Sequence, residues 1–403
     1  MKKLLLLIHF VLCIIAVSAQ NDYEDTVHPF INERSLIKGN ERFDVYVPLL
    51  ENKRIGVVCN HTSIVCNKTH LIDTLLTYKI NIKTILTPEH GFKGSEEAGK
   101  LINGLNYYKD TIKIISLYGK NKKPTAEQIN DIDIIIFDLQ DVGCRFYTYI
   151  STLEYVMAAC IENNKQLIVL DRPNPNNFVA GPVLKNNCKS FVGMQNIPVC
   201  YGLTIGEYAN MINKENLVKA NQCCELSIIP MLNYNRDSIY SLDVAPSPNL
   251  QTMQAIRNYP TLCLFEGTPV SVGRGTQDPF EIIGFPAYDK YSKSDKHNGS
   301  NNIISFTPKS LKGIAENPPF KDKLCTGRRI SIDTNEIVLE YVIDMYKIYP
   351  DKSNFFTPMF DLLTGDTEMK KQIIAGKTAQ QIRMSWNKEI NEYENVRKKY
   401  IMY

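Results

Sequence analysis

Short apolar runs alternate with polar segments along the first half of the chain. Between Arg54 and Pro175, five runs rich in Ile and Val are each followed at once by polar residues with Gly or Pro among them. The runs are RIGVVCN, KTILT, IKIIS, DIIIFDLQ and QLIVL, at residues 54–60, 83–87, 112–116, 133–140 and 166–170. Their lengths and their content of β-branched residues predict five buried strands.

Helical patterns fill some of the intervals between and after these runs. From Tyr149 to Ile161, apolar residues recur at spacings of three and four, which predicts an amphipathic helix that ends at Asn163-Asn164. A second helix is predicted to open with Pro124 in its first turn. A third is predicted at Thr204, where Glu207 completes a capping box. Strands that alternate with helices predict an α/β fold with a Rossmann-like, doubly wound and mostly parallel sheet.

The polar residues that follow the strands predict one site. In an open parallel sheet, ligands bind in the crevice outside the carboxyl ends of the strands, so residues directly after the strands are expected to converge. The candidates are Asn60 and His61 after the first run, Glu89 and His90 after the second, Asp141, Arg145 and Tyr147 after the fourth, and Asp171, Arg172 and Asn174 after the fifth.

Glu89 is the leading candidate for an acid. It follows a buried strand and lies among Pro88, Gly91 and Phe92. An apolar surrounding raises the pKa of a carboxyl group, as a general acid at neutral pH requires. The alternative is a glutamate that only hydrogen-bonds a neighbouring loop.

Two arginines are candidates for binding a substrate carboxylate. Arg145 has the planar fork that grips a carboxylate through two hydrogen bonds, and it is equally suited to be the counter-ion of Asp141. Arg172 and Asp171 pose the same question in a stiffer segment, because Pro173 and Pro175 restrict the backbone. The sequence leaves both alternatives open.

Loops rich in Pro and Gly in the second half add further candidates. Glu266 follows an apolar run, Arg274 lies in the glycine-rich segment GRGT, and Asn249 ends the motif PSPN. These glycines lack the spacing of a phosphate-binding loop, so no nucleotide cofactor is predicted. The histidines His61 and His90 lack the spacing of metal ligands, so no metal is predicted.

The first residues have the features of an export signal. Lys2-Lys3 precedes an apolar run from Leu4 to Val17, and Ser18-Ala19 supplies the small residues of a cleavage site. We expect residues 1–19 to be a signal peptide. The apolar run is shorter than the ~20 residues that span a bilayer. An exported, periplasmic protein without a stable membrane anchor after cleavage is therefore expected, with secretion, or an anchor that is retained, as the alternatives.

The length of the remaining chain favours two domains. About 380 residues exceed the size at which a single core stops growing. The predicted division is a Rossmann-like domain over residues 20–185 and a smaller auxiliary α/β domain over residues 186–403, ending in a charged helix from Ala379 to Tyr403.

The charge of the chain gives no reason to expect nucleic acid as a partner. The 46 Lys and Arg and 43 Asp and Glu leave a net charge of +3, and loss of Lys2 and Lys3 reduces it to +1. Ten cysteines follow Cys13, and none forms a CxxC pair. Most are expected to be buried thiols.

Taken together, the motifs along the chain resemble one protein family. They are NHT, PEHGF, SLYG, DLQDVG-x-R-FYTYISTL, LDRPNP, FVG, IP-x-x-YGLTIGE, PSPN, EGT-x-x-S-x-GRGT-x-PFE and R-x-x-Y-x-x-Y. In this order they resemble the exo-β-N-acetylmuramidases of the NamZ type, over about residues 35 to 403. Ser63 stands where the family usually has glycine after NHT, and Leu250-Gln251 replaces its usual Met-Pro after PSPN.

The resemblance implies an exo-acting glycoside hydrolase that releases β-1,4-linked N-acetylmuramic acid from the non-reducing end of peptidoglycan fragments. It also implies an active-site cleft between the two domains. Carried over by motif, Glu89 is the expected catalytic acid, and Glu266, Asp171, Arg172 and Arg274 are expected in the cleft. Glu266 and Asp171 are the candidates for a second catalytic carboxylate. N-acetylmuramic acid carries a lactyl carboxylate, and one arginine among Arg145, Arg172 and Arg274 is expected to bind it.

Two rival functions remain open from the sequence. A non-catalytic binding protein for peptidoglycan fragments would use the same polar residues and stack tyrosines on the sugar rings, with Tyr107, Tyr108, Tyr118, Tyr147 and Tyr149 as candidates. A nucleotide-dependent enzyme would be stabilised by NAD or ATP. The partner expected from the resemblance is a carbohydrate, and the oligomeric state is not predicted.

Overall fold

The protein is described here as a computed structural model that covers residues 35–89, 91–93, 106–107, 112–219, 221–238, 240–291 and 303–403. His90, one of the predicted site residues, lies outside the described residues. Residues 37–403 form one compact unit.

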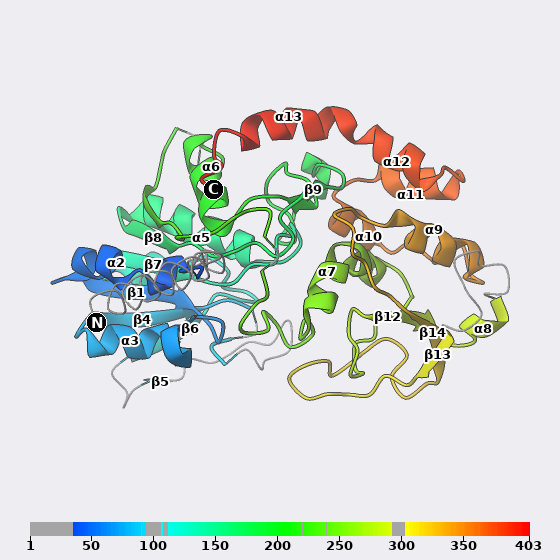
Figure 1. Cartoon of the computed structure of the whole chain (residues 1–403), viewed down its shortest axis with the longest axis horizontal. Coiled ribbons are helices and arrows are strands. Elements are labelled where there is room, and N and C mark those ends of the chain that lie inside the picture. Colours follow the sequence, from blue (N-terminus) through cyan, green and yellow to red (C-terminus); the bar gives the residue numbers. More distant parts are fainter. Residues whose placement is uncertain are drawn as a thin grey trace, which may run out of the picture. The chain divides into compact units, whose positions relative to one another are not determined.

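A seven-stranded sheet forms the centre of the N-terminal domain (Figure 1). Across the sheet the strands are β11 (Glu225–Ile229), β8 (Gln166–Leu170), β7 (Ile134–Asp138), β1 (Arg54–Cys59), β4 (Asn81–Thr87), β6 (Ile112–Ser116) and β5 (Asn106–Tyr107). All neighbours pair in parallel except β5, which is antiparallel to β6. The six parallel strands, numbered along the chain, follow the order 3-2-1-4-5-6 of the Rossmann fold. The predicted α/β class and all five predicted strands are confirmed.

Both faces of this sheet are buried at its centre, which explains why the central strands are mostly apolar. Successive residues of a strand point to opposite faces. In β7, Ile135 and Phe137 belong to a core that includes Leu153 of α5, whereas Ile134 and Ile136 belong to a second core that includes Leu75 of α3. The helices of this domain are α2 (Phe43–Leu50), α3 (Leu71–Thr77), α4 (Ala126–Ile129), α5 (Tyr149–Asn163) and α6 (Ile205–Lys214).

The helix boundaries follow the predicted end signals with one correction. Asn164 ends α5 in the left-handed conformation, and Thr204 caps α6 in a capping box with Glu207. Pro124 does not lie in the first turn of α4, because Thr125 is the N-cap and the helix begins at Ala126. Within the described residues, no helix is long and apolar enough to cross a membrane.

The smaller C-terminal domain combines a three-stranded antiparallel sheet with helices (Figure 1). Its elements are α7 (Met253–Leu262), β12 (Ile282–Phe285), α8 (Tyr288–Tyr291), β13 (Ile303–Phe306), β14 (Cys325–Arg329), α9 (Leu339–Ile348), α10 (Pro358–Thr364), α11 (Glu368–Ile374), α12 (Ala379–Ser385) and α13 (Asn387–Arg397). Two-stranded ribbons elsewhere pair β2 (Ile64–Val65) with β3 (Thr69–His70) and β9 (Val179–Ala180) with β10 (Cys200–Tyr201). The 3-10 helices are η1 (Gly39–Glu41), η2 (Cys66–Lys68), η3 (Asn186–Cys188) and η4 (Cys263–Gly267).

The predicted division at residue 185 stays a prediction. The central sheet takes strands from both sides of that residue, because β11 pairs with β8. The segment between them also carries α6, which packs on β8 and β11.

The chain end returns to the N-terminal domain. In place of the single predicted helix from Ala379, the structure has α12 and α13, joined at Trp386. The Tyr393 hydroxyl donates to the carbonyl of Tyr201 at 2.6 Å, and the Tyr403 hydroxyl donates to Asp171 at 2.7 Å. The last residues therefore cross-link the two halves of the chain.

Candidate active site

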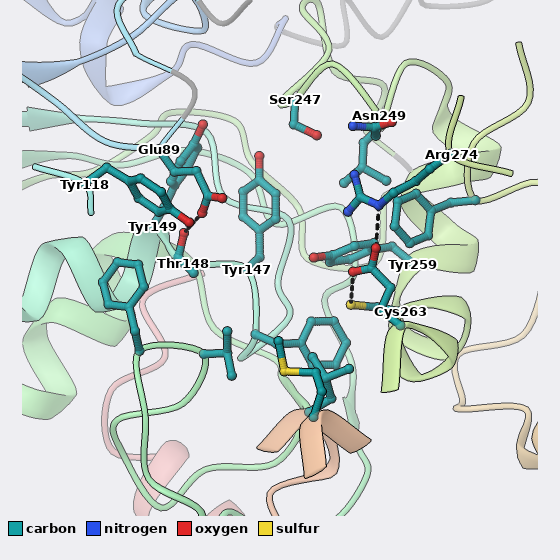
Figure 2. Close-up of a pocket in the computed structure, with 18 residues that line it drawn as sticks. Glu89, Tyr118, Tyr147, Thr148, Tyr149, Ser247, Asn249, Tyr259, Cys263 and Arg274 are labelled. Atoms are coloured by element: carbon teal, nitrogen blue, oxygen red, sulfur yellow. Dashed lines mark hydrogen bonds and ion pairs between the residues drawn. The ribbon is translucent and has the colours of Figure 1, made fainter. Parts of the chain in front are cut away.

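A cavity of about 260 Å³ lies beyond the carboxyl ends of the sheet strands, and residues from both domains line it (Figure 2). We call it the main cavity. Glu89 follows β4, Tyr118 follows β6, and residues 146–149 lead into α5. The other lining residues are Phe191, Val192, Ser247, Asn249, Leu250, Tyr259, Cys263, Glu266, Arg274, Phe280, Met359 and Leu363. The segments after β4, β6 and β7 thus contribute to one cavity, whereas the predicted site residues after β1 and β8 do not line it.

Glu89 is held in the cavity by two hydroxyl groups. The Thr148 hydroxyl donates to Glu89 Oε2 at 2.8 Å, and the Tyr118 hydroxyl is also hydrogen-bonded to Glu89. Burial, followed by the negative charge of Glu89, raises the pKa of Tyr118, so this phenol remains a neutral donor at physiological pH. The carboxyl group is therefore oriented while it faces the cavity.

Tyrosine rings form the floor of the cavity beside Glu89. Tyr147 and Tyr149 pack edge to face with their ring centroids 4.8 Å apart, and the Tyr147 hydroxyl donates to the carbonyl of Pro246 at 2.8 Å. Figure 2 shows Tyr147 between Glu89 and Arg274. Aromatic faces combined with polar groups are suited to binding a sugar ring, which has both apolar and hydroxyl-bearing surfaces.

Asn60 lies behind Tyr149 and does not line the main cavity itself. Its side chain donates to the Tyr149 hydroxyl at 2.7 Å and accepts from the backbone and hydroxyl of Thr62. It is fully buried, and both the nitrogen and the oxygen of its amide group take part in these contacts.

Glu266 and Arg274 form an ion pair on the C-terminal side of the cavity. Arg274 Nε donates to Glu266 Oε1, and the guanidinium group lies over the ring of Phe280 at 5.1 Å. Burial acts to lower the pKa of Arg274, but the charge of Glu266 and the hydrogen bond to it outweigh burial and raise that pKa above its ordinary value. Arg274 is therefore a permanent cation in the cavity.

Asn249 also lines the cavity and retains an unused acceptor. Its Nδ2 atom donates to the carbonyl of Ile314 at 3.0 Å, which fixes the orientation of the amide group. Its Oδ1 atom is buried and has no hydrogen-bond partner among the described residues. An N–H or O–H donor of a ligand is the natural partner for such an atom.

Arg145 is a structural residue in this fold. Its guanidinium group is fully buried and donates to four carbonyl groups, those of Pro182, Ile197, Leu363 and Thr364, at 2.7 to 3.0 Å. Burial lowers its pKa to about 10, so the group remains charged at neutral pH. The structure supports neither a substrate carboxylate nor Asp141 as its partner.

Asp171 and Arg172 are likewise bound within the protein. Asp171 accepts hydrogen bonds from Thr204, Gly206 and Tyr403, and it does not line the main cavity. Burial raises its pKa to about 6, against the lowering effect of these hydrogen bonds. Arg172 forms a buried ion pair with Asp138 at 2.6 Å.

The other predicted residues also lie outside the main cavity. His61 Nε2 is 2.9 Å from the carbonyl oxygen of Ala245. Asn174 donates to the carbonyl of Leu203 at 2.9 Å. Asp141 accepts from Gly143 and from the hydroxyl of Tyr201. Among the residues that the structure covers, no group of three or more His, Cys, Asp or Glu side chains is arranged to hold a metal ion.

The buried carboxyl group of Asp141 predicts an unusual pH dependence of stability. Burial raises its pKa from 3.8 to about 7. The folded state therefore binds this proton more tightly than the unfolded state does. Between these two pH values, the group makes the free energy of unfolding fall by about 1.4 kcal/mol per pH unit as the pH rises. Asp141→Asn is expected to remove this slope, as measured by urea denaturation at pH 5, 6 and 7.

The exposed Asp131→Asn substitution is the matched control for this measurement and is expected to retain the wild-type slope. A wild-type protein and an Asp141→Asn variant whose unfolding free energies differ by the same amount at all three pH values would show that Asp141 does not titrate in this way.

Several residues of the cavity were not predicted from the sequence. Thr148, Phe191 and Tyr259 line it, although no motif argument selects them. Thr148 lies in the FYTYISTL run directly before α5. This position is the only feature of the sequence that could have indicated Thr148 as a cavity residue. The tyrosines Tyr118, Tyr147 and Tyr149, considered as stacking residues, are in the cavity.

Comparisons with known proteins cover most of the chain. Residues 55–254 match the family described as exo-beta-N-acetylmuramidase NamZ, N-terminal, and residues 257–403 match its C-terminal counterpart. The peptidoglycan beta-N-acetylmuramidase NamZ of Bacillus subtilis (strain 168) is 35% identical over 375 residues, which is 89% of each chain.

Two crystal structures of DUF1343 family proteins from Bacteroides fragilis NCTC 9343 are also similar. One has a TM-score of 0.80 and 40% identity over 92% of this chain and 99% of its own. The other has a TM-score of 0.78 and 29% identity over 91% of this chain and 99% of its own.

The fold, the cavity and these matches define a glycosidase with a parallel-sheet domain and a smaller C-terminal domain. The chain belongs to the NamZ family of exo-β-N-acetylmuramidases, and the resemblance found in the sequence is confirmed.

Proposed function

We propose that this protein acts on peptidoglycan fragments, where it hydrolyses the β-1,4 bond that follows a non-reducing N-acetylmuramic acid and releases that sugar. One observation carries the proposal: Glu89 and Glu266, from different domains, are the carboxylates among the described residues that line the main cavity. The Bacillus subtilis relative, described as a peptidoglycan β-N-acetylmuramidase, supports the same substrate.

Glu89 is the proposed general acid. Glycoside hydrolysis requires a carboxylic acid that protonates the oxygen of the leaving sugar. The hydrogen bond from Thr148 to Oε2 fixes the orientation of the carboxyl group. A hydrogen bond with Tyr118, which follows β6, also holds this carboxyl group in place. This arrangement keeps the acid in place before the substrate arrives.

Glu266 is the proposed second carboxylate. Of the two candidates from the sequence, Asp171 has its carboxylate engaged by Thr204, Gly206 and Tyr403 outside the cavity, whereas Glu266 lines it. Its ion pair with Arg274 holds the carboxyl group in place on the C-terminal side of the cavity.

The test is incubation of the protein with a defined disaccharide in which N-acetylmuramic acid is linked β-1,4 to N-acetylglucosamine. Mass analysis is expected to detect both free monosaccharides, and the Glu89→Gln/Glu266→Gln double variant is expected to produce neither. A protein that binds the disaccharide in calorimetry and leaves it intact over hours would instead be a binding protein for peptidoglycan fragments.

We also propose that the protein is exported to the periplasm. The support is the sequence of residues 1–19, which has a basic start, an apolar run and small residues before Gln20. Determination of the N-terminus of the protein recovered from its native cell tests this directly. A mature N-terminus at Gln20 in the periplasmic fraction is expected, and an intact Met1 in the cytosol would contradict the proposal.

A further inference from the structure

Arg274 is the one Lys or Arg among the described residues that line the main cavity. The other two arginines considered as substrate ligands are used elsewhere. Arg145 binds four backbone carbonyls, and Arg172 is paired with Asp138. A negatively charged group of a substrate in this cavity therefore has a single cationic partner within the described residues.

The guanidinium group of Arg274 is fixed in orientation but only partly used. Glu266 accepts from Nε, and the ring of Phe280 lies against the guanidinium group at 5.1 Å. The two terminal nitrogens make no hydrogen bond to any described residue. Figure 2 shows this end of Arg274 directed toward Tyr147 and the interior of the cavity. Two adjacent N–H donors in a fixed plane match the two oxygens of a carboxylate.

The sugar of the proposed function carries such a group. N-acetylmuramic acid differs from N-acetylglucosamine by a lactyl ether on O3 that ends in a carboxylate. The leaving oxygen on the anomeric carbon and the lactyl group on O3 lie at different positions on the ring, so the proton donor and the ligand of the lactyl carboxylate must be at separate places in the cavity. Figure 2 shows Glu89 and Arg274 on opposite sides of Tyr147, in agreement with this requirement.

We propose that Arg274 binds the lactyl carboxylate of the non-reducing sugar through its two terminal nitrogens, and that Glu266 and Phe280 hold it in the orientation to do so. This inference rests on the proposed function and names the residue that selects muramic acid over glucosamine at that site.

The charges in the cavity make this role necessary for an anionic sugar. Glu266 lines the same cavity, so without Arg274 the lactyl carboxylate would lie near another carboxyl group with no cationic partner among the described lining residues. Arg274 pairs with Glu266 and is positioned to bridge Glu266 and the substrate carboxylate when the sugar is bound. The same contact is absent for a sugar with a hydroxyl group in place of the lactyl group, which gives specificity through a charge that only one substrate supplies.

Calorimetry with monosaccharides tests the proposal without any need for hydrolysis. The probes are N-acetylmuramic acid and its lactyl methyl ester, which has no charge and is larger by one methyl group. Wild-type protein is expected to bind the acid about 10- to 100-fold more tightly than the ester, the range of hydrogen bonds to a charged group. Arg274→Gln is expected to bind both equally, and Arg274→Lys, which keeps the charge but lacks the fork, is expected to fall between them.

Lys122 supplies a matched control. Its ammonium group lies 4.3 Å from the ring centroid of Phe191, another residue of the cavity wall, so Lys122→Gln removes a nearby positive charge without changing Arg274. This variant is expected to keep the wild-type preference for the acid. A preference that is lost equally in Lys122→Gln would indicate a general electrostatic effect and overturn the proposal.

The outcomes separate this inference from the proposed function. Equal binding of acid and ester by the wild-type protein, or a preference that survives in Arg274→Gln, overturns the role of Arg274 even where the disaccharide is hydrolysed. Failure of hydrolysis together with an Arg274-dependent preference overturns the catalytic proposal and leaves the carboxylate site in place. Wild-type protein that binds neither sugar contradicts both.

Discussion

Replacement of Glu89 by Gln is expected to reduce kcat on the muramic acid–glucosamine disaccharide by about 10²- to 10⁴-fold, the usual contribution of general acid catalysis. Gln has nearly the same shape and can still accept a hydrogen bond from Thr148. Its amide group is not acidic, so it cannot protonate the leaving oxygen. The substrate KM is expected to change little. Steady-state kinetics by quantification of released sugar measures both constants.

A second substrate separates loss of the acid from general damage to the site. A 4-nitrophenyl muramide has a leaving group that departs without protonation, so the Glu89→Gln variant is expected to retain far more of its activity on it than on the disaccharide. Glu127→Gln, on the exposed side of α4, is the matched control and is expected to behave as wild type. Wild-type turnover of the disaccharide by a folded Glu89→Gln protein would eliminate Glu89 as the acid.

Arg145→Met is expected to lower the free energy of unfolding by about 3–5 kcal/mol, because it removes a buried charge and leaves four carbonyl groups without their shared donor. Those carbonyls belong to two segments, one around residues 182–197 and one at the end of α10. Loss of Arg145 therefore loosens the contact between them. Urea denaturation followed by circular dichroism measures the change.

Two further variants serve as comparisons in this experiment, Arg145→Lys as the conservative substitution and Arg54→Gln as the exposed control. Lysine keeps the charge but reaches fewer of the four carbonyls, so most of the loss is expected to remain. Arg54 forms an exposed pair with Asp133, and its replacement by Gln is expected to leave the denaturation midpoint nearly unchanged. An Arg145→Met protein as stable as the Arg54→Gln protein would contradict the structural role of Arg145.

The central sheet could be predicted because the apolar pattern of each central strand lies within one short segment of the sequence. The central strand β7 is buried on both faces, so every residue from Ile134 to Phe137 is apolar, and a run of this kind is visible without knowledge of its neighbours. The helix α5 is equally visible, since its apolar stripe and its left-handed end at Asn164 lie within one segment. The C-terminal domain has short elements separated by long loops, and its pattern was correspondingly weak.

The site could be predicted only in part, because the role of a polar residue depends on distant partners. Glu89, Tyr147, Asn249, Glu266 and Arg274 line the main cavity. Arg145 binds Thr364, and Asp171 binds Tyr403, at separations of 219 and 232 residues. A sequence motif shows that an arginine or an aspartate follows a strand. It does not show that residues far along the chain form hydrogen bonds with that side chain in the folded protein.

The most direct test of the account is a crystal structure of the Glu89→Gln protein with the intact disaccharide. The account predicts that the muramic acid ring lies in the main cavity, with the glycosidic oxygen within about 2.6–3.2 Å of the side chain at position 89 and the lactyl carboxylate on Arg274. A disaccharide bound elsewhere, or one whose glycosidic oxygen lies on the far side of Tyr147 from residue 89, would contradict it.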